Sequence, residues 1–356
     1  MARIRSFVKR EPVLLLSALA ALVSCFFVAP DAGYLAYIDW RTLALLYCLM
    51  TVVAGLRQAG LFAYLAHILC LRAGTLRAMG TLLVALCFVS SMLITNDVAL
   101  LTFVPFAVVV LGMAGQSRAL IHVVVLQTVA ANLGSILTPV GNPQNLYLYS
   151  YYDFPMADFL GVTFPVWALS LVLILLGCLI LPRTPLTVFL GETPLLNRRR
   201  LRIYGALFLI CMLTVLRVLP WPAMLGTVIA VLLIFDRKML LKADFLLLLT
   251  FAAFFVFSGN LARVPAVDNL LRRLLGGREY LAALLTSQVI SNVPAALLLG
   301  VNVGGLGTPI ASLASLISMK LYSHSEHADA GRYLAEFTLV NLLLLALLSG
   351  FVLLTA

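Results

Sequence analysis

Two polar clusters, at residues 90–100 and 287–297, interrupt apolar stretches of this chain. Their central residues are Thr95, Asn96 and Asp97 in the first cluster, and Ser291 and Asn292 in the second. Carboxylate, amide and hydroxyl oxygens are ligands that Na+ prefers, and amide NH2 groups can donate hydrogen bonds to an anion. The same residues can also satisfy a local turn, so each residue alone is weak support for a binding site.

A break rich in Gly, Pro and polar residues follows each cluster, at 132–145 and at 304–312. Its polar and turn-forming residues are Thr138, Gly141, Asn142 and Asn145 in the first break, and Thr308 and Ser312 in the second. Closely spaced Pro and Gly cannot keep a helical hydrogen-bond ladder, so each helix must unwind there. Unwound carbonyls can bind a cation, and the adjoining helix N-termini can attract an anion. We therefore predict one substrate and ion site formed by both clusters and both breaks, with Na+ held by Asn96, Asp97, Asn142 and Asn292.

Asp97 is the only carboxylate that we place deep in the apolar part of the chain. An ionisable group at that depth costs roughly 2.5 kcal/mol or more, which favours a role in binding a cation or a proton. Asp is also a favoured helix N-cap. The two roles are compatible.

The composition predicts an all-α polytopic membrane protein. Hydrophobic residues make up 63% of the 356 residues and charged residues only 11%, and apolar stretches recur near the ~20 residues that span a bilayer. The net charge of +10 comes from Lys and Arg in short loops, which agrees with the positive-inside rule and not with nucleic-acid binding. We expect a multi-pass protein of the cytoplasmic membrane with its basic N-terminus in the cytoplasm. The six cysteines lie in apolar stretches and are expected to be unpaired packing residues.

The order of the segments predicts an inverted-topology repeat with two re-entrant hairpins and two broken transmembrane helices. The first half, 1–182, holds a hairpin at about 79–112, whose arms of about fifteen residues are short for full crossings, and a broken helix at about 119–150. A cytoplasmic linker at 183–202 leads to the second half, 203–356, with a hairpin at about 279–300 and a broken helix at about 303–320. We expect residues 61–71 to form an interfacial helix, and a full crossing by the segment 59–78 stays an alternative.

Residues 95–99, 131–145, 291–295 and 306–314 resemble the citrate-transporter-like permeases of the ion transporter superfamily, which includes divalent anion/sodium symporters and arsenite efflux permeases. The resemblance covers nearly the whole chain. It implies a scaffold and a transport domain, a homodimer and an elevator-like movement. In the symporters, Ser-Asn-Thr tips bind Na+ and substrate carboxylates; here Asp97 and Val293 occupy the third tip positions, which is closer to the arsenite permeases.

One departure from that pattern concerns spacing. Asn96 and Thr138 are 42 positions apart, but Asn292 and Thr308 only 16. Sixteen helical residues extend about 24 Å, too short for a returning hairpin arm and the first half of a broken helix together. Either the second hairpin is truncated or loop residues are absent.

We therefore predict an ion-coupled secondary transporter of a small anion, with Na+ or H+ as the coupling ion and no other cofactor. The alternative within transport is a proton-coupled efflux permease for arsenite or a similar oxyacid. A membrane enzyme or a non-transporting scaffold is the alternative of another class, but the chain has no HExxH, phosphate-binding loop or catalytic-triad pattern.

Overall fold

The computed structural model describes residues 12–31, 33–71, 73–186, 195–263, 298–308, 311–323, 325 and 328–355. Within these ranges the regular structure is helical, apart from an isolated bridge between Thr75 and Pro185. The helices of the first half are α2 (Pro12–Ser24), α3 (Tyr34–Tyr37), α4 (Trp40–Gln58), α5 (Leu61–Cys70), α6 (Leu76–Leu93), α7 (Asn96–Met113), α8 (Ser117–Gly134), η1 (Ser135–Leu137), α9 (Pro143–Tyr151) and α10 (Met156–Cys178). Those of the second half are α11 (Arg198–Val215), α12 (Trp221–Phe235), η2 (Arg237–Leu241), α13 (Phe245–Ala262), α16 (Leu298–Gly304), α17 (Leu313–Ser323) and α18 (Ala330–Thr355).

Five of the described helical segments are long and apolar enough to cross a membrane: α4, α6, α8 with η1, α10 and α18. Their length matches the ~20 residues that a bilayer requires. The predicted all-α polytopic membrane protein is thus confirmed.

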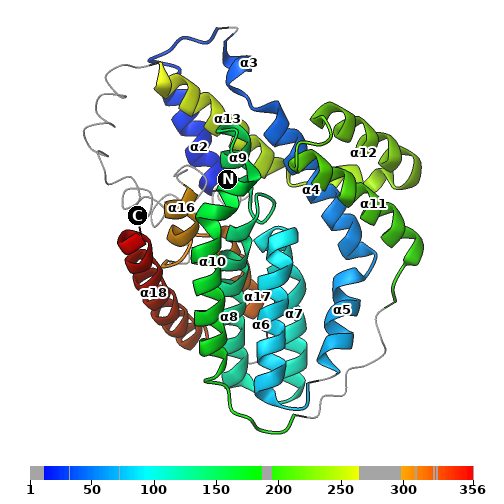
Figure 1. Cartoon of the computed structure of the whole chain (residues 1–356), viewed down its shortest axis with the longest axis vertical. Helices are drawn as coiled ribbons and strands as arrows, with labels where there is room; N and C mark the ends of the chain where they lie inside the picture. The colour runs from blue at the N-terminus through cyan, green and yellow to red at the C-terminus, as the bar shows by residue number, and fades with distance from the viewer. Residues whose placement is uncertain are drawn as a thin grey trace, which may run out of the picture.

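Helix α8 is the central element of the bundle (Figure 1). Every residue from Ala119 to Gly134 is buried. By contrast, α10 and α18 bury one residue every three or four positions, such as Phe159, Thr163 and Val166 in α10, and leave large apolar side chains exposed on the other face. One-sided burial at this spacing is typical of a peripheral helix whose outer face meets lipid.

Helices α6 and α7 form the predicted helical hairpin, with Ile94 and Thr95 between them. Each arm has 18 residues, longer than the predicted fifteen. The hydroxyl of Thr75 accepts a hydrogen bond from Ala78 N at 3.2 Å and thereby caps α6. The helix begins at Leu76, three residues before the predicted start of the hairpin. Because these arms approach the length of a full crossing, re-entry into the membrane stays a prediction.

Pro105 lies inside α7 and has no N–H to offer to the carbonyl of Leu101. Arg57, in the last turn of α4, donates from Nη2 to that carbonyl at 3.3 Å. The arginine thus replaces the backbone donor that proline lacks.

The open end of this hairpin lies at the end of the bundle where α10 finishes. Leu76 N donates to Thr184 O at 2.9 Å, and Arg77 Nε donates to Leu181 O at 2.6 Å. The start of α6 and the segment after α10 therefore share one side of the molecule, as the predicted cytoplasmic positions of both require.

In the second half, α16 and α17 lie where a second broken helix is predicted. Residues 305–312 separate α16 from α17, and α16 begins five residues before the predicted position 303. Helix α11 begins at Arg198, inside the predicted linker, because the side chain of Asn197 accepts a hydrogen bond from Arg200 N at 3.0 Å and caps it. Most of the predicted second hairpin, with Ser291 and Asn292, lies outside the described residues.

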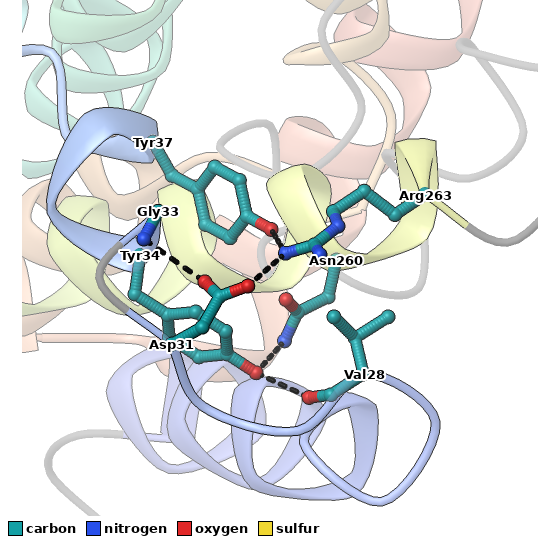
Figure 2. A network of polar contacts seen from close by, with 7 residues as sticks. All are labelled: Val28, Asp31, Gly33, Tyr34, Tyr37, Asn260 and Arg263. Carbon is teal, nitrogen blue, oxygen red and sulfur yellow. Dashed lines mark hydrogen bonds and ion pairs between the residues drawn. The ribbon is translucent and has the colours of Figure 1, made fainter.

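A polar contact joins the segment after α2 to the end of α13 (Figure 2). Arg263 donates from Nη1 to Asp31 Oδ2 at 3.0 Å and to the hydroxyl of Tyr37 at 2.8 Å, and Asn260 Nδ2 donates to the hydroxyl of Tyr34 at 2.8 Å. The hydrogen bond from Arg263 holds the pKa of Asp31 below its usual value, so the pair is ionised at neutral pH.

Candidate functional site

The first break is held open by side chains that replace the missing helical hydrogen bonds. Asn142 caps α9, because its Oδ1 accepts a hydrogen bond from Asn145 N at 2.8 Å, and Pro143 occupies the first helical position. The hydroxyl of Thr138 donates to the carbonyl of Met92 and accepts from Gly141 N at 3.1 Å. The break therefore rests against the end of α6.

Gly141 is required by close backbone approach. A Cβ atom at this position would lie 2.2 Å from the carbonyl oxygen of Ser135. No real Cβ approaches a backbone atom so closely, so the two ends of the broken helix can meet only at a glycine.

Asn145 satisfies the carbonyls that the end of α8 leaves free. Its Nδ2 is within 3.2 Å of the carbonyl oxygens of Ser135, Ile136 and Thr138, and the residue is fully buried. A helix end buried without such donors would be costly. Asn145 thus has a structural role in the predicted site.

Asn132, in α8, connects the tip of the first hairpin with the second break. Its Oδ1 accepts from Asn96 Nδ2 at 3.2 Å and from the hydroxyl of Ser312 at 2.9 Å. Its Nδ2 donates to the hydroxyl of Ser315, in α17, at 3.4 Å. Asn96 also donates from its backbone N to Gly141 O at 3.1 Å, so the hairpin tip contacts the first break directly.

A pair of amide contacts joins the first break to α16 of the other half. Asn142 Nδ2 donates to Asn302 Oδ1 at 3.0 Å, and Asn302 Nδ2 donates to Asn145 Oδ1 at 2.6 Å. Asn142 Nδ2 also lies 3.2 Å from the hydroxyl of Ser135. All four residues are buried.

We call these eight residues the amide cluster: Asn96, Asn132, Ser135, Asn142, Asn145, Asn302, Ser312 and Ser315. Every side chain in it is uncharged, and the cluster joins both halves of the chain. The N-termini of α7, α9 and α17 all meet it, at Asn96, Asn142 and Ser312 respectively. Three positive helix ends directed at one buried polar region form an environment that favours negative charge.

Asp97 lies in the first turn of α7, beside the amide cluster but not in it. Its backbone N donates to Asn96 Oδ1 at 2.9 Å. Within the described residues its carboxylate accepts no hydrogen bond, and it lies close enough to Asp244, before α13, to interact electrostatically. Thr95 occupies the N-cap position of α7, but its side chain makes no capping hydrogen bond.

The structure thus brings together Asn96, Thr138, Gly141, Asn142, Asn145 and Ser312 from the predicted site. Thr308 is exposed in the second break, where its carbonyl accepts from Ala311 N at 3.0 Å. Ser291 and Asn292 stay predicted members of the site.

Four members of the amide cluster were not predicted as site residues: Asn132, Ser135, Asn302 and Ser315. Asn132 and Ser135 belong to the 131–145 segment that carries the family resemblance, which is a signal that could have found them. Asn302 is a lone amide two residues before the glycines of the second break, and its partners are about 160 positions away in the sequence. Position in an apolar stretch was the only sign of its role.

Comparison with known proteins identifies the family of the chain. The family model described as citrate transporter (CitMHS) matches residues 4–319. The chain is 31% identical over 338 residues to the inner membrane protein YbiR of Escherichia coli, covering 90% of this chain and 88% of that protein. It is 29% identical over 318 residues to the uncharacterized transporter MJ0456 of Methanocaldococcus jannaschii, covering 83% and 84%.

A shorter similarity links the chain to a plant protein. The silicon efflux transporter LSI3 of Oryza sativa subsp. japonica is 34% identical over 131 residues, which cover 36% of this chain and 26% of that protein. With the match over 4–319, these findings show that the chain is a membrane transporter of the citrate transporter family and not an enzyme.

Proposed function

We propose that the protein is an ion-coupled secondary transporter of a small anion, which binds at the amide cluster. The observation that carries this proposal is the meeting of three helix N-termini at a buried set of amides and hydroxyls drawn from both halves of the chain. Positive helix ends and amide NH2 groups can stabilise a bound anion without a cationic side chain.

Asp97 supplies the coupling cation site in this proposal. The amide oxygens of Asn96 and Asn142 each accept one described hydrogen bond, which leaves a second lone pair for Na+. Asp244 adds a second negative charge near Asp97, which favours binding of a cation by Asp97. Asn292 is the predicted contribution of the second hairpin.

Transport then proceeds by movement of the domain that holds the two broken helices relative to the scaffold, in a homodimer of the cytoplasmic membrane with its N-terminus in the cytoplasm. The amide cluster supports a common moving unit, because its hydrogen bonds join α8, α9, α16 and α17. Breaking these buried hydrogen bonds in each transport cycle would cost free energy, whereas moving the four helices as one unit keeps the bonds intact.

A proton-coupled efflux permease for arsenite or a similar oxyacid is the second candidate. It is favoured by the uncharged side chains of the amide cluster, which suit a neutral polyhydroxy acid, and by the similarity to the rice silicon efflux transporter. Hydroxyl groups of such an acid can donate to amide oxygens and accept from amide NH2 groups.

Flux into proteoliposomes tests both candidates. The purified protein is reconstituted, and uptake of citrate, sulfate, arsenite and germanic acid is measured with and without Na+ and with and without a pH gradient. Ion-driven uptake of citrate or sulfate supports the first candidate, and pH-driven flux of arsenite or germanic acid supports the second. Absence of flux for all four solutes under every condition would count against both.

A further inference from the structure

His122 and Glu336 form a partly buried contact outside the amide cluster. His122 lies in α8, and its Nδ1 is 2.5 Å from Oε1 of Glu336, in α18. Its Nε2 is 3.0 Å from the carbonyl oxygen of Gly177, next to the last residue of α10. The imidazole thus joins three helices at the end of the bundle where α8 and α18 begin and α10 ends.

The partners of the imidazole determine where its protons lie. A carbonyl oxygen can only accept, so the hydrogen bond to Gly177 places a proton on Nε2. Without a second proton, the lone pair of Nδ1 would face a carboxylate oxygen at 2.5 Å, which is repulsive. The contact with Glu336 therefore requires one proton between Nδ1 and Oε1.

This proton can exchange with water at the same end of the bundle. The side chain of Glu336 is 25% exposed, whereas that of His122 is 11% exposed. The C-terminal end of α10 beside the ring also favours the imidazolium form. Release of the proton leaves neutral imidazole bound to Gly177 and facing an ionised Glu336, which weakens the contact between α8 and α18.

Other ionisable groups lie at the same end of the bundle as His122 and Glu336. On the elements packed around the pair these groups are Arg77, Arg118, Cys178, Lys320, Tyr322, Asp329, Arg332 and Tyr333. The contacts described for His122 itself are those with Glu336 and with the carbonyl of Gly177. The shared proton therefore lies between His122 and Glu336.

We propose that His122 and Glu336 together form a proton-binding site that takes up and releases one proton during transport. This inference rests on the proposed ion-coupled transport and adds a site distinct from Asp97. His122 and Asn132 of the amide cluster lie on the same helix, about 15 Å apart along its axis, which gives the pair a mechanical link to the proposed substrate site. A change in the contact between α8 and α18 is transmitted along that helix.

The first test needs no transported solute. Nuclear magnetic resonance of the purified protein with 15N-labelled histidine reports the imidazole protons, infrared spectroscopy reports the carboxyl of Glu336, and His122→Gln and Glu336→Gln assign the two signals. We expect the pair to change protonation between about pH 5 and about pH 8, the range in which histidines titrate. If neither group changes across that range, the proposal is wrong, whatever the protein transports.

The second test measures coupling in proteoliposomes with arsenite and citrate as probes. Glu336→Gln is expected to retain exchange of the probe between the two sides at equal pH, because exchange needs no net proton movement, and to lose accumulation driven by a pH gradient. Asp329→Asn is the matched control, since Asp329 is an exposed acidic residue that caps the same helix. Full pH-driven accumulation by Glu336→Gln overturns the proposal, whereas absence of exchange in the wild type contradicts the proposed function instead.

Discussion

Asn142 and Asn302 face each other across the two halves of the chain, with Nδ2 of the first donating to Oδ1 of the second at 3.0 Å. Asn142 caps α9, the second part of the first broken helix. Asn302 lies in α16, the first part of the second broken helix. The contact therefore fixes the two breaks relative to each other.

Asn302→Ala removes both amide contacts to the other half. Buried groups on Asn142 and Asn145 lose a partner, at a cost of about 1–3 kcal/mol for each unsatisfied group. We expect a lower melting temperature and loss of flux. Asn341→Ala is the matched control, because Asn341 is also buried and its described hydrogen bond stays within its own helix, to Phe337 O at 2.8 Å. Equal effects of the two substitutions would contradict a special role for Asn302.

Gly141→Ala places a methyl group against the carbonyl of Ser135, where the available distance is 2.2 Å. Overpacking of this kind costs typically about 1–3 kcal/mol, so we expect reduced stability and impaired binding. Gly161→Ala serves as the control, since a Cβ there meets nothing within 4 Å. Melting temperature and flux are measured for both variants. If Gly141→Ala melts and transports like the wild type, the first break can rearrange to accept a side chain at this position.

Asp97→Asn keeps the shape of the side chain and removes its charge. If Asp97 holds the coupling cation, the variant loses the ion dependence of uptake while its melting temperature stays near that of the wild type. Asp158→Asn is the control, because Asp158 is also an acidic residue in the first turn of a helix, α10, but is exposed. Retention of full ion-driven uptake by Asp97→Asn would remove this residue from the mechanism.

Thr138→Val tests the contact between the first break and the hairpin. The substitution removes the donor to Met92 O and the acceptor for Gly141 N, and the net loss per hydrogen bond is about 1 kcal/mol. We expect a modest decrease in stability together with weaker substrate binding, measured by thermal shift and flux. Thr227→Val provides the comparison, because the described hydrogen bond of its hydroxyl stays within α12, to Ala223 O at 2.8 Å. If the two variants have the same stability and flux, Thr138 has no role beyond that of an ordinary helical threonine.

Local sequence chemistry predicted the breaks better than it predicted their partners. Pro139, Gly141 and Pro143 exclude an intact helix, and this is independent of the rest of the fold. The role of Asn302 depends on residues about 160 positions away, which no local pattern shows. Glu336 was also missed, because an acidic residue near the start of a helix is ordinary until its histidine is known.

Helix lengths were predicted less accurately for a related reason. An apolar stretch shows that a hairpin arm exists, but its ends depend on capping side chains, as Thr75 shows for α6. Helix α11 likewise begins inside the predicted linker, because Asn197 caps it within the basic segment. Both differences concern helix ends, where single hydrogen bonds decide.

The complete burial of α8 from Ala119 to Gly134 has a consequence for biosynthesis. This helix is made and inserted before α16, α17 and α18 exist, so Thr128 and Asn132 enter the membrane without Ser318 and Ser315, their later partners in α17. Insertion depends on the apolar residues of the segment as a whole. The buried valines and alanines of α8 therefore serve twice, first by making the segment apolar enough to insert and then by packing in the folded core. Membrane integration and final packing can be impaired by different substitutions in this one helix.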